Sequence, residues 1–305
     1  MSGEAVKIGP EKCGFVAVIG LPNAGKSTLI NALVGTKVSI VSRRVQTTRT
    51  RVLGIVCEGN SQVVLIDTPG VFQPQKTLER AMVGAAWESI EGADKIIHLV
   101  DSAYKDPVRE NADIMKKLAG KKNVILVLNK VDKAKKPELL ALAQKMNDAF
   151  PYEATFMISS LKGTGVDDIL KTLAEKMPEV PWAFPEDQAS DMPMRLFAAE
   201  ITREKIFQRL HQELPHSVLV ETESWEEFDN GDLKLTQLVY VQRASQRAIV
   251  LGKGGSQIKE IGQAARTELE EMLERRVHLK LFVKVQEDWP EKSSFYQAMG
   301  LDFRG

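Results

Sequence analysis

The sequence has very little cysteine: only Cys13 and Cys57 occur in 305 residues. A fold held together by disulfides needs more cysteines than this, so the protein is not a disulfide-stabilised secreted domain, and reduced thiols are expected. The four histidines are scattered along the chain, and with so few cysteines they do not form the spacing of a zinc site. Structural metal binding through Cys and His is therefore not expected.

Long hydrophobic runs and net charge are also missing. No stretch approaches the about 18 continuous apolar residues of a membrane span, and the opening MSGEAVKIGPEKCG lacks the apolar core of a signal peptide. The 41 basic residues balance the 41 acidic ones, so any attraction to nucleic acid must be local. With 43% hydrophobic residues, the composition is that of a globular protein, and 305 residues suggest about two domains. A soluble cytoplasmic protein is the default expectation.

The first part of the chain alternates short apolar runs with longer amphipathic segments. The runs are nearly continuous and rich in β-branched residues, which is typical of parallel strands buried on both faces. They cover residues 15–20, 63–67, 95–101, 123–130 and 154–159, and the helix-like segments between them cover 78–92, 107–119 and 137–148. This alternation predicts a doubly wound, mostly parallel α/β sheet. Residues 51–59 lead into the 63–67 run like a hairpin, which adds one antiparallel strand.

The amino-acid composition changes at the end of this first part. Residues 178–193, PEVPWAFPEDQASDMP, hold four prolines in 16 residues, and proline neither continues helices nor fits a central strand. We interpret this segment as a linker between a domain at 1–177 and a second one at 194–305. The second part reads helix, strand, strand, helix, strand, with a DNGD turn between the first two strands, which predicts a smaller α+β domain.

The segment GLPNAGKS, from Gly20 to Ser27, has the full GxxxxGK[ST] spacing of a phosphate-binding loop. It follows a predicted strand and precedes a predicted helix, which is the context that this loop requires. Its glycines let backbone N–H groups converge on phosphate oxygens, Lys26 reaches the β- and γ-phosphates, and the Ser27 hydroxyl binds Mg²⁺.

Two further motifs end predicted strands. In DTPG, Asp67 would hold Mg²⁺ through water and the Gly70 N–H would bond a γ-phosphate; taken alone, the motif is equally well a strand followed by a Pro-Gly turn. In NKVD, the Asp132 carboxylate would accept two hydrogen bonds from guanine, a pair that adenine does not offer. Asn129 and Lys130 would brace that loop, and the ISS sequence at 158–160 would support the base from its other side.

The order and spacing of these four motifs resemble those of the translation-factor-like GTPases, over about residues 12–176. That resemblance implies GTP, GDP and Mg²⁺ as ligands, and a threonine in a flexible loop that closes on Mg²⁺. The sequence RRVQTTRTR at 43–51 lies where this loop belongs, with Thr48 as the first choice and Thr47 as the second.

The sequence lacks a glutamine that would be expected to take part in catalysis. Ras-like GTPases position water with a glutamine after the motif glycine, and Val71 stands here instead. The resemblance is therefore to the branch with a hydrophobic residue at this place, which predicts slow intrinsic hydrolysis. Asn23 matches an asparagine of potassium-stimulated members, so K⁺ is a candidate second cation; the alternative is that Asn23 only supports the loop backbone.

A second glycine loop, GKGG at 252–255, fits the GxxG pattern of a KH domain, with apolar residues before it and Ile258 and Ile261 after it. Such a loop lets the backbone of single-stranded nucleic acid approach closely. The segment from Leu233 to Val285 contains ten Lys and Arg residues but only five Glu, an excess of five positive charges within a chain of zero net charge. This local basic zone fits a phosphate backbone. The alternative is a plain glycine turn between helices with solvated charges.

A GTPase domain followed by a C-terminal KH domain resembles the Era family of bacterial GTPases, nearly end to end. The resemblance implies a GTP hydrolase that binds the 3′ region of small-subunit rRNA and assists maturation of the 30S ribosomal subunit. It also implies a cytoplasmic monomer, with peripheral contact to the inner membrane. The sequence SSL at 159–161, where the family often has Ser-Ala, departs mildly from the pattern.

The residues expected at the sites follow from these motifs. Lys26, Thr48 and Gly70 are the catalytic candidates, and Ser27, Thr48 and Asp67 the metal ligands. The nucleotide-binding candidates are Asn23, Ala24, Gly25, Lys26, Ser27, Thr28, Asp67, Gly70, Asn129, Lys130, Asp132, Ser159, Ser160 and Leu161. The RNA-binding candidates are Arg243, Arg247, Gly252, Lys253, Gly254, Gly255 and Lys259.

Two other classes of function compete with this one. The protein could be an accessory factor in RNA processing or modification, but that needs a second catalytic constellation, and the sequence has no cysteine nucleophile motif or metal cluster. Alternatively, the KH domain could bind protein, and the basic zone argues against this.

Overall fold

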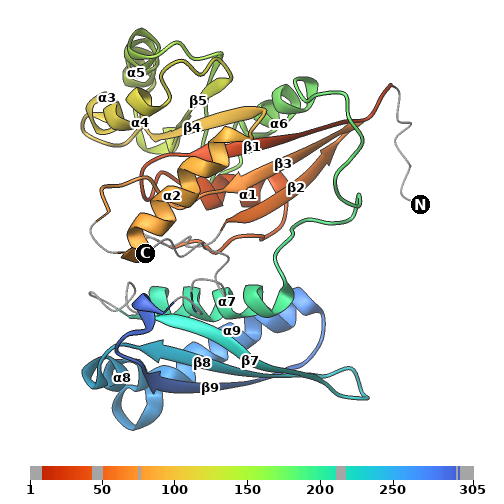
Figure 1. The fold of residues 1–305 in the computed structure, drawn as a ribbon, viewed down its shortest axis with the longest axis vertical. Coiled ribbons are helices and arrows are strands. Elements are labelled where there is room, and N and C mark those ends of the chain that lie inside the picture. Colours follow the sequence, from red (N-terminus) through yellow and green to blue (C-terminus); the bar gives the residue numbers. More distant parts are fainter. Residues whose placement is uncertain (1–8, 43–50, 75–76, 211–217, 293–294, 296–305) are drawn as a thin grey trace. The chain divides into compact units, whose positions relative to one another are not determined.

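The computed structural model describes residues 9–42, 51–74, 77–210, 218–292 and 295, and they divide into two units (Figure 1). Unit 1 takes residues 9–39, 51–74 and 77–191, and unit 2 takes residues 40–42, 192–210, 218–292 and 295. Each unit has its own sheet, of six strands in unit 1 and three in unit 2. The predicted fold class, a Ras-like α/β domain followed by a smaller α+β KH-type domain, is confirmed.

The sheet of unit 1 has the order β2-β3-β1-β4-β5-β6. All neighbouring pairs are parallel except β2 and β3, which form the predicted antiparallel hairpin. The strands are β1 (Lys12–Ile19), β2 (Val52–Glu58), β3 (Ser61–Asp67), β4 (Lys95–Asp101), β5 (Val124–Asn129) and β6 (Ala154–Met157). Every residue of β3 and β5 is buried, as expected for strands covered on both faces.

Helices cover both faces of this sheet (Figure 1). They are α1 (Lys26–Val34), α2 (Thr77–Glu91), α3 (Pro107–Glu110), α4 (Ala112–Lys117), α5 (Lys136–Ala149) and α6 (Val166–Glu175). Because side chains alternate along a strand, Val16 and Val18 of β1 join the core with α1 and α6. Ala17 and Ile19 join the opposite core, with α2, α4 and α5.

The helix predicted over 107–119 is two short helices, α3 and α4, which is a correction to the sequence-based boundary. Asn111 lies between them with φ −97° and ψ 6°, outside helical geometry. Its side-chain amide donates to the Pro107 carbonyl at 2.8 Å, and its Oδ1 faces the buried His98 ring at 3.1 Å. This polar anchor holds the backbone where a continuous helix would otherwise run.

The proline-rich segment follows the edge of unit 1 over most of its length. The Ile55 N–H of edge strand β2 donates to the Ala189 carbonyl at 2.8 Å, and the Leu53 N–H donates to the Asp191 carboxylate at 3.0 Å. The Gln62 side chain accepts from the Phe184 N–H and donates to its carbonyl. An exposed strand edge invites unwanted pairing, and this segment covers it.

Unit 2 has the sheet order β7-β8-β9, with β7 and β8 antiparallel and β8 and β9 parallel. Its elements are α7 (Met194–Arg209), β7 (Leu219–Glu227), β8 (Leu233–Val241), α8 (Ala244–Leu251), α9 (Ser256–Leu273) and β9 (Val277–Val285). Helix α8 was not separated from the glycine loop in the sequence-based order, because eight residues ending at a glycine carry little periodicity. Within the described residues, the structure contains no helix with the length and apolar character needed to cross a bilayer.

Candidate functional site

The phosphate-loop motif connects β1 to α1, which begins at Lys26. Gly25 has φ +103°, and a Cβ added there would lie 2.4 Å from the Asn129 side-chain nitrogen. Only glycine accepts both this conformation and this close approach. Asn23 also has a positive φ, 62°, and its side chain is exposed. Ala24 is fully buried, and Thr28 lies in the first turn of α1.

Lys26 lies folded over the loop. Its Nζ donates to the Gly20 carbonyl at 3.2 Å and to the Leu21 carbonyl at 3.0 Å. Burial lowers the pKa of Lys26 to about 8, against the opposing effect of the nearby Asp67 charge. A buried ammonium group held by two neutral carbonyls would be better matched by phosphate oxygens, so the loop is electrostatically prepared for an anion.

Ser27 and Asp67 come together from two different elements. The Ser27 hydroxyl at the start of α1 donates to Asp67 Oδ2 at the end of β3, at 2.8 Å. Asp67 is completely buried. A hydroxyl and a carboxylate are the hard oxygen ligands that Mg²⁺ takes in proteins, so this pair fits the metal predicted for the site. Thr47 and Thr48, the predicted third ligand and its alternative, lie outside the described residues.

The DTPG turn packs directly on the phosphate loop. A Cβ at Gly70 would lie 2.9 Å from Pro22 Cα, and the Val71 N–H donates to the Gly20 carbonyl at 3.1 Å. The Val71 side chain is 8% exposed and belongs to the core around Ile19. Val71 has no hydrogen-bonding side-chain group, so it cannot orient a water molecule.

Asn129 links the phosphate loop to the 159–161 loop, which would support a base. Its side-chain amide donates to the Ala24 carbonyl at 2.8 Å. Its Oδ1 accepts from both the backbone N–H and the hydroxyl of Ser160, each at 3.0 Å. These bonds use all hydrogen-bonding groups of the buried Asn129 side chain except one amide hydrogen. Asn129 therefore stabilises the loops and does not recognise the base.

Asp132 is exposed, and it is hydrogen-bonded to the buried Ser159 of the neighbouring loop. The Ser159 hydroxyl donates to Asp132 Oδ1 at 2.7 Å, and this hydrogen bond lowers the pKa of the carboxyl group. Asp132 is thus held as an ionised acceptor, as recognition of guanine requires. Leu161 is 80% exposed, next to these residues in sequence.

Asp101 is a positioning residue that the sequence motifs did not include. Lys130 Nζ donates to Asp101 Oδ2 and to the Asn23 carbonyl, both at 2.6 Å. Asp101 ends β4, which lies beside β5 in the sheet. An acidic residue at the carboxyl end of a strand next to the NKVD strand is a usable signal, because such ends meet at one edge of a parallel sheet.

The second glycine loop joins α8 to α9. Gly252 has φ +73°, and a Cβ there would lie 2.6 Å from Gln257 Cβ. Gly254 and Gly255 also have positive φ, but a Cβ at either would meet no atom within 4 Å. The first glycine is therefore needed for packing, while the other two leave open space beside the exposed Lys253.

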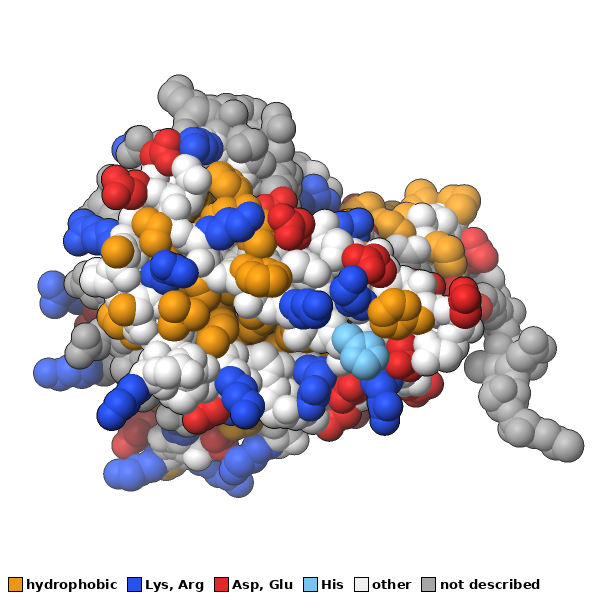
Figure 2. Space-filling view, turned by 90° about the horizontal axis from the view of Figure 1, so that it is seen from below, with side chains coloured by type: hydrophobic (Ala, Val, Ile, Leu, Met, Phe, Trp, Pro, Cys, Tyr) orange, Lys and Arg blue, Asp and Glu red, His pale blue; other side chains and the backbone are white. Residues whose placement is uncertain are grey.

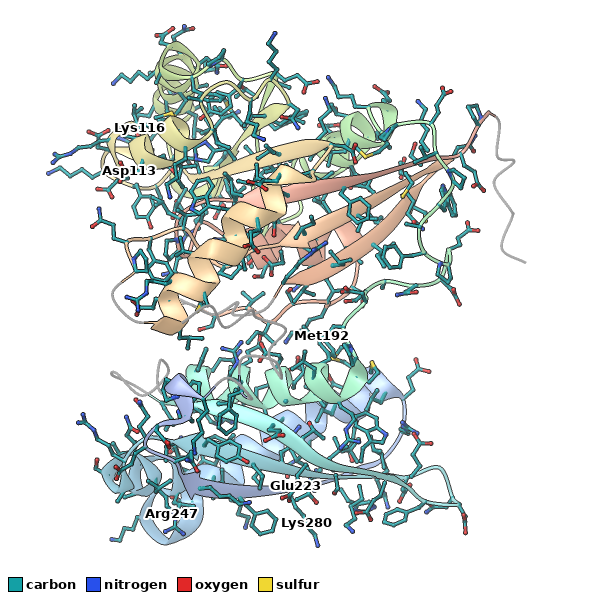
Figure 3. The ribbon with its side chains drawn as sticks, viewed as in Figure 1. Asp113, Lys116, Met192, Glu223, Arg247 and Lys280 are labelled. Carbon is teal, nitrogen blue, oxygen red and sulfur yellow. The ribbon has the colours of Figure 1, made fainter. Side chains whose placement is uncertain are left out.

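Next to this loop, α9 and β9 approach closely. A Cβ at Gly262 of α9 would lie 3.4 Å from Leu281 Cδ1 of β9. Half-buried Ile258 and Leu281 pack against the same core of unit 2. The predicted RNA contacts Arg243, Arg247 and Lys259 are all exposed on α8 and α9 or just before α8. The face of unit 2 seen from below in Figure 2 carries Lys and Arg side chains around a strip of hydrophobic ones. In Figure 3, Arg247 extends from α8.

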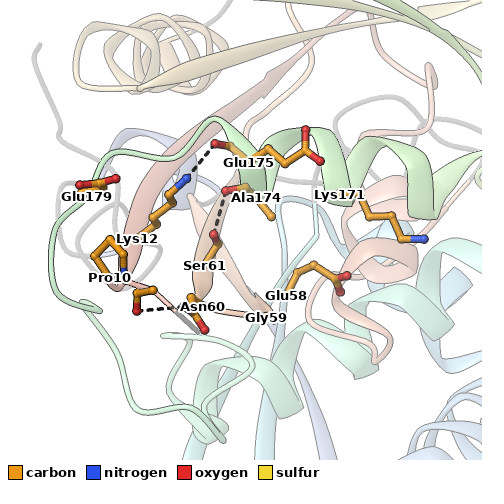
Figure 4. Close-up of a pocket in the computed structure, with 11 residues that line it drawn as sticks. Pro10, Lys12, Glu58, Gly59, Asn60, Ser61, Lys171, Ala174, Glu175 and Glu179 are labelled. Atoms are coloured by element: carbon orange, nitrogen blue, oxygen red, sulfur yellow. Dashed lines mark hydrogen bonds between the residues drawn. The ribbon is translucent and has the colours of Figure 1, made fainter. Parts of the chain in front are cut away.

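A hollow at the other end of the unit 1 sheet has a structural explanation (Figure 4). Lys12 Nζ donates to the Glu175 carbonyl at 3.1 Å, and the Ser61 hydroxyl donates to the Ala174 carbonyl at 2.7 Å. These carbonyls end α6, where no further helical turn can satisfy them. The polar groups of this hollow therefore cap a helix.

Comparison with known proteins agrees with this geometry. The family model described as 50S ribosome-binding GTPase matches residues 15–130, and that described as KH domain matches residues 213–290. GTPase Era of Brucella suis biovar 1 is 55% identical over 294 residues, which cover 96% of this chain and 94% of that protein.

Two solved structures cover 95% of this chain and 99% of their own. The crystal structure of a variant of Aquifex aeolicus Era bound to GDP·AlF4⁻ has 38% identity and a TM-score of 0.89. The crystal structure of Era in complex with MgGDPNP and nucleotides 1506–1542 of 16S ribosomal RNA has 39% identity and a TM-score of 0.88. With a phosphate loop and a GxxG loop on one chain, and with this identity over nearly its whole length, the chain belongs to the Era family of GTPases.

Proposed function

We propose that this protein hydrolyses GTP to GDP and phosphate as a switch, binds the single-stranded 3′ region of small-subunit rRNA, and assists assembly of the 30S ribosomal subunit. The observation that carries the proposal is the presence on one chain of the Asp132–Ser159 pair, which fits guanine, and a GxxG loop in a basic zone. A similar Era structure holds both MgGDPNP and 16S rRNA nucleotides.

In unit 1, the phosphate loop would surround the β- and γ-phosphates with backbone N–H groups, and Lys26 would leave its two carbonyls for phosphate oxygens. Ser27 and Asp67 would hold Mg²⁺ with Thr48, and the metal neutralises charge that develops on the phosphates. The Gly70 N–H would bond the γ-phosphate. Hydrolysis would be slow, because Val71 is buried in the core.

Selection of guanine would rest on Asp132. An ionised carboxylate accepts from both the N1–H and the exocyclic amine of guanine, while adenine leaves it unsatisfied. Ser159 holds the carboxylate through its hydroxyl, which leaves the second oxygen for the base. Asn129 and Lys130 would keep this loop aligned with the phosphate loop through the Ala24 and Asn23 carbonyls.

K⁺ is proposed as a second cation at Asn23. The residue has the left-handed φ of 62° and an exposed side chain, and its carbonyl is already engaged by Lys130. A cation there would offset negative charge between the phosphates, as the arginine finger does in other GTPases. Equal hydrolysis rates in K⁺ and Na⁺ buffers of the same ionic strength would reject this role.

In unit 2, RNA would pass over Gly252, Lys253, Gly254 and Gly255. The open space at Gly254 and Gly255 supports close approach of a sugar-phosphate backbone. Exposed Arg243, Arg247 and Lys259 would add phosphate contacts and therefore make the RNA affinity depend on salt.

We propose the organisation 1–177 for the GTPase domain, 178–193 for the linker and 194–305 for the KH domain. We also propose that the protein is a cytoplasmic monomer that associates peripherally with the inner membrane.

The first test measures the affinity of a short oligonucleotide with the 3′-end sequence of the rRNA, at fixed salt, with a GTP analogue and then with GDP. Tighter binding in one state would support a nucleotide switch. Equal binding would leave two working sites without coupling through this RNA alone, and would direct the test to the 30S particle. No binding in either state would reject this RNA and favour a protein partner for unit 2.

Two variants separate the sites in the same assay. Lys26→Ala should abolish GTP hydrolysis and leave oligonucleotide binding by the nucleotide-free protein unchanged. Lys253→Glu should weaken the oligonucleotide and leave hydrolysis unchanged, because Lys253 belongs to unit 2 and the nucleotide pocket is built from residues of unit 1.

A further inference from the structure

The outer face of the unit 2 sheet carries an aromatic side chain between two lysines. Along β9, Leu279, Leu281 and Val283 pack against the cores of unit 2, so Lys280, Phe282 and Lys284 project from the opposite face. Phe282 is 52% exposed and both lysines are exposed. In Figure 3, Lys280 extends from the side of the sheet that is turned away from α7.

The neighbours of Phe282 explain only part of its position. Its strand partner on β8 is Leu238, which is 4% exposed, so Phe282 helps to cover one apolar side chain. A leucine would serve that purpose equally well. Tyr240 on the same face already has an aromatic neighbour, Phe295, at 5.2 Å between ring centroids. Among the described residues Phe282 has no such partner, so its ring remains available.

We propose that Phe282 is a stacking platform for a base of single-stranded RNA, with Lys280 and Lys284 contacting the adjacent phosphates. The RNA would first follow the surface between the GxxG loop (252–255), α9 and β9, here called the GxxG groove, and would then cross the edge of β9. The inference rests on the proposed RNA-binding function of unit 2. Continuity along β9 supports it, because Leu281, which lies beside α9 next to the groove, and Phe282 are consecutive residues on opposite faces of an edge strand. Sheets that bind single strands use exposed aromatic rings in this way.

The charges of the face favour RNA over an apolar protein segment as the occupant. Among the described residues Lys280 has no ion pair within 4.0 Å, although its charge contributes to lowering the pKa of Glu226. Lys284 has only a long contact to Glu223, 3.8 Å, between half-exposed side chains. A pair of this kind contributes little, since water screens it. An aromatic ring between two exposed cations matches alternating bases and phosphates, whereas a purely apolar partner would remove water from both ammonium groups and supply no negative charge.

The chain offers a matched control on the same sheet. Phe228 is 43% exposed, close to the 52% of Phe282, but it follows Glu226 and Glu227 at the end of β7. Glu226 pairs with Lys234 at 2.8 Å, and Glu227 pairs with Arg275 at 3.1 Å. These two cations beside Phe228 are therefore already neutralised and are poor partners for a phosphate. The Phe228 ring also contacts the His278 ring, at 6.0 Å between centroids. Loss of the Phe228 ring should therefore leave RNA affinity unchanged, although it removes a similar exposed apolar area.

The experiment compares two oligonucleotides from the same 3′-end sequence by fluorescence anisotropy at fixed salt. One spans about four nucleotides, enough for the GxxG groove, and the other about twice that length. Wild type should bind the longer one more tightly. Phe282→Leu keeps the apolar cover of Leu238 but removes the ring, and should weaken the longer oligonucleotide about 5- to 100-fold while leaving the shorter one unchanged. Phe282→Trp should match or exceed wild type, and Phe228→Leu should match it.

Each outcome decides a separate point. If Phe282→Leu binds the longer oligonucleotide as wild type does, the stacking platform is rejected, while binding of the short one still supports the proposed function. If wild type binds neither oligonucleotide, both proposals fail together. If Phe282→Leu weakens both oligonucleotides equally, the ring acts through the fold of unit 2 and not by stacking, which also overturns the inference. GTP hydrolysis by each variant verifies that unit 1 is intact.

Discussion

The buried His98 in β4 predicts a specific acid sensitivity of unit 1. The side chain is completely buried, with Nδ1 2.8 Å from the Tyr152 hydroxyl and Nε2 3.1 Å from Asn111 Oδ1. Because the Asn111 amide nitrogen donates to the Pro107 carbonyl, Oδ1 must accept, and Nε2 carries the proton. Nδ1 then accepts the Tyr152 hydroxyl, so the neutral ring has both its hydrogen bonds.

The magnitude follows from the pKa of this ring. Burial lowers the pKa of His98 from 6.5 to about 4. Below pH 6.5 the unfolded chain takes up a proton that the folded protein resists, so the stabilising contribution is complete above pH 6.5 and is lost progressively toward pH 4. At 1.36 kcal/mol for each pKa unit, the full loss is about 3 kcal/mol. A domain with a total stability of about 5–15 kcal/mol would feel this strongly.

The assay compares urea unfolding of wild type and His98→Gln at about pH 7.5 and about pH 4.5. Glutamine can still donate to Asn111 but has no proton to gain. At the higher pH the variant should be less stable by about 1–3 kcal/mol, because the Tyr152 hydroxyl loses its acceptor. On acidification, wild type should lose about 2–3 kcal/mol more than the variant. Carboxyl groups titrate equally in both proteins, so the difference isolates the imidazole.

Two results would refute this reasoning. The first is an equal loss of stability in the two proteins between the two pH values. The second is direct titration of the His98 ring by NMR near its ordinary pKa, which would show that the folded protein accepts the proton without a penalty.

The remaining predictions concern the two glycine loops and the base pocket. Asp132→Asn replaces an acceptor with a donor, so GTP should lose at least about 100-fold in affinity and xanthosine triphosphate should gain, as measured by nucleotide competition. Above pH 8 the Lys26 side chain is a neutral amine and must take up a proton to bind phosphate. GTP affinity should therefore fall by about tenfold per pH unit, and calorimetry should show the proton uptake. A flat affinity profile from pH 7 to about 9.5 would contradict the lowered pKa. Gly252→Ala combines φ +73° with a Cβ 2.6 Å from Gln257, so oligonucleotide affinity should fall about tenfold or more while GTP hydrolysis stays unchanged.

The contacts of residues 178–193 could not be predicted from composition. Prolines correctly indicate a break in regular structure at 178–193, yet the segment pairs with edge strand β2 through Ala189 and Asp191. Composition describes what a segment cannot form. Whether it then lies free or covers an edge depends on which donors the neighbouring strand leaves open, and that is known only once the sheet is assembled.

By itself, the sequence determined the fold class, the type of each long element and the chemistry of the two loops. These follow from local rules: glycine is strongly favoured where φ is positive, as at Gly25 and Gly252, and buried parallel strands have a distinctive composition. Such rules act within a few residues, so they can be applied without knowing what lies across the molecule.

Only the tertiary structure decided how the predicted residues cooperate. It brought the Ser159 hydroxyl to Asp132, placed Asn129 between the Ala24 carbonyl and the 159–161 loop, and joined Lys130 to Asp101. Each of these bonds links residues at least 27 positions apart, so each depends on strand order and register, not on local propensity. The same register exposes Phe282 on one face of β9 while its neighbours are packed on the other, a distinction that no single strand sequence reveals.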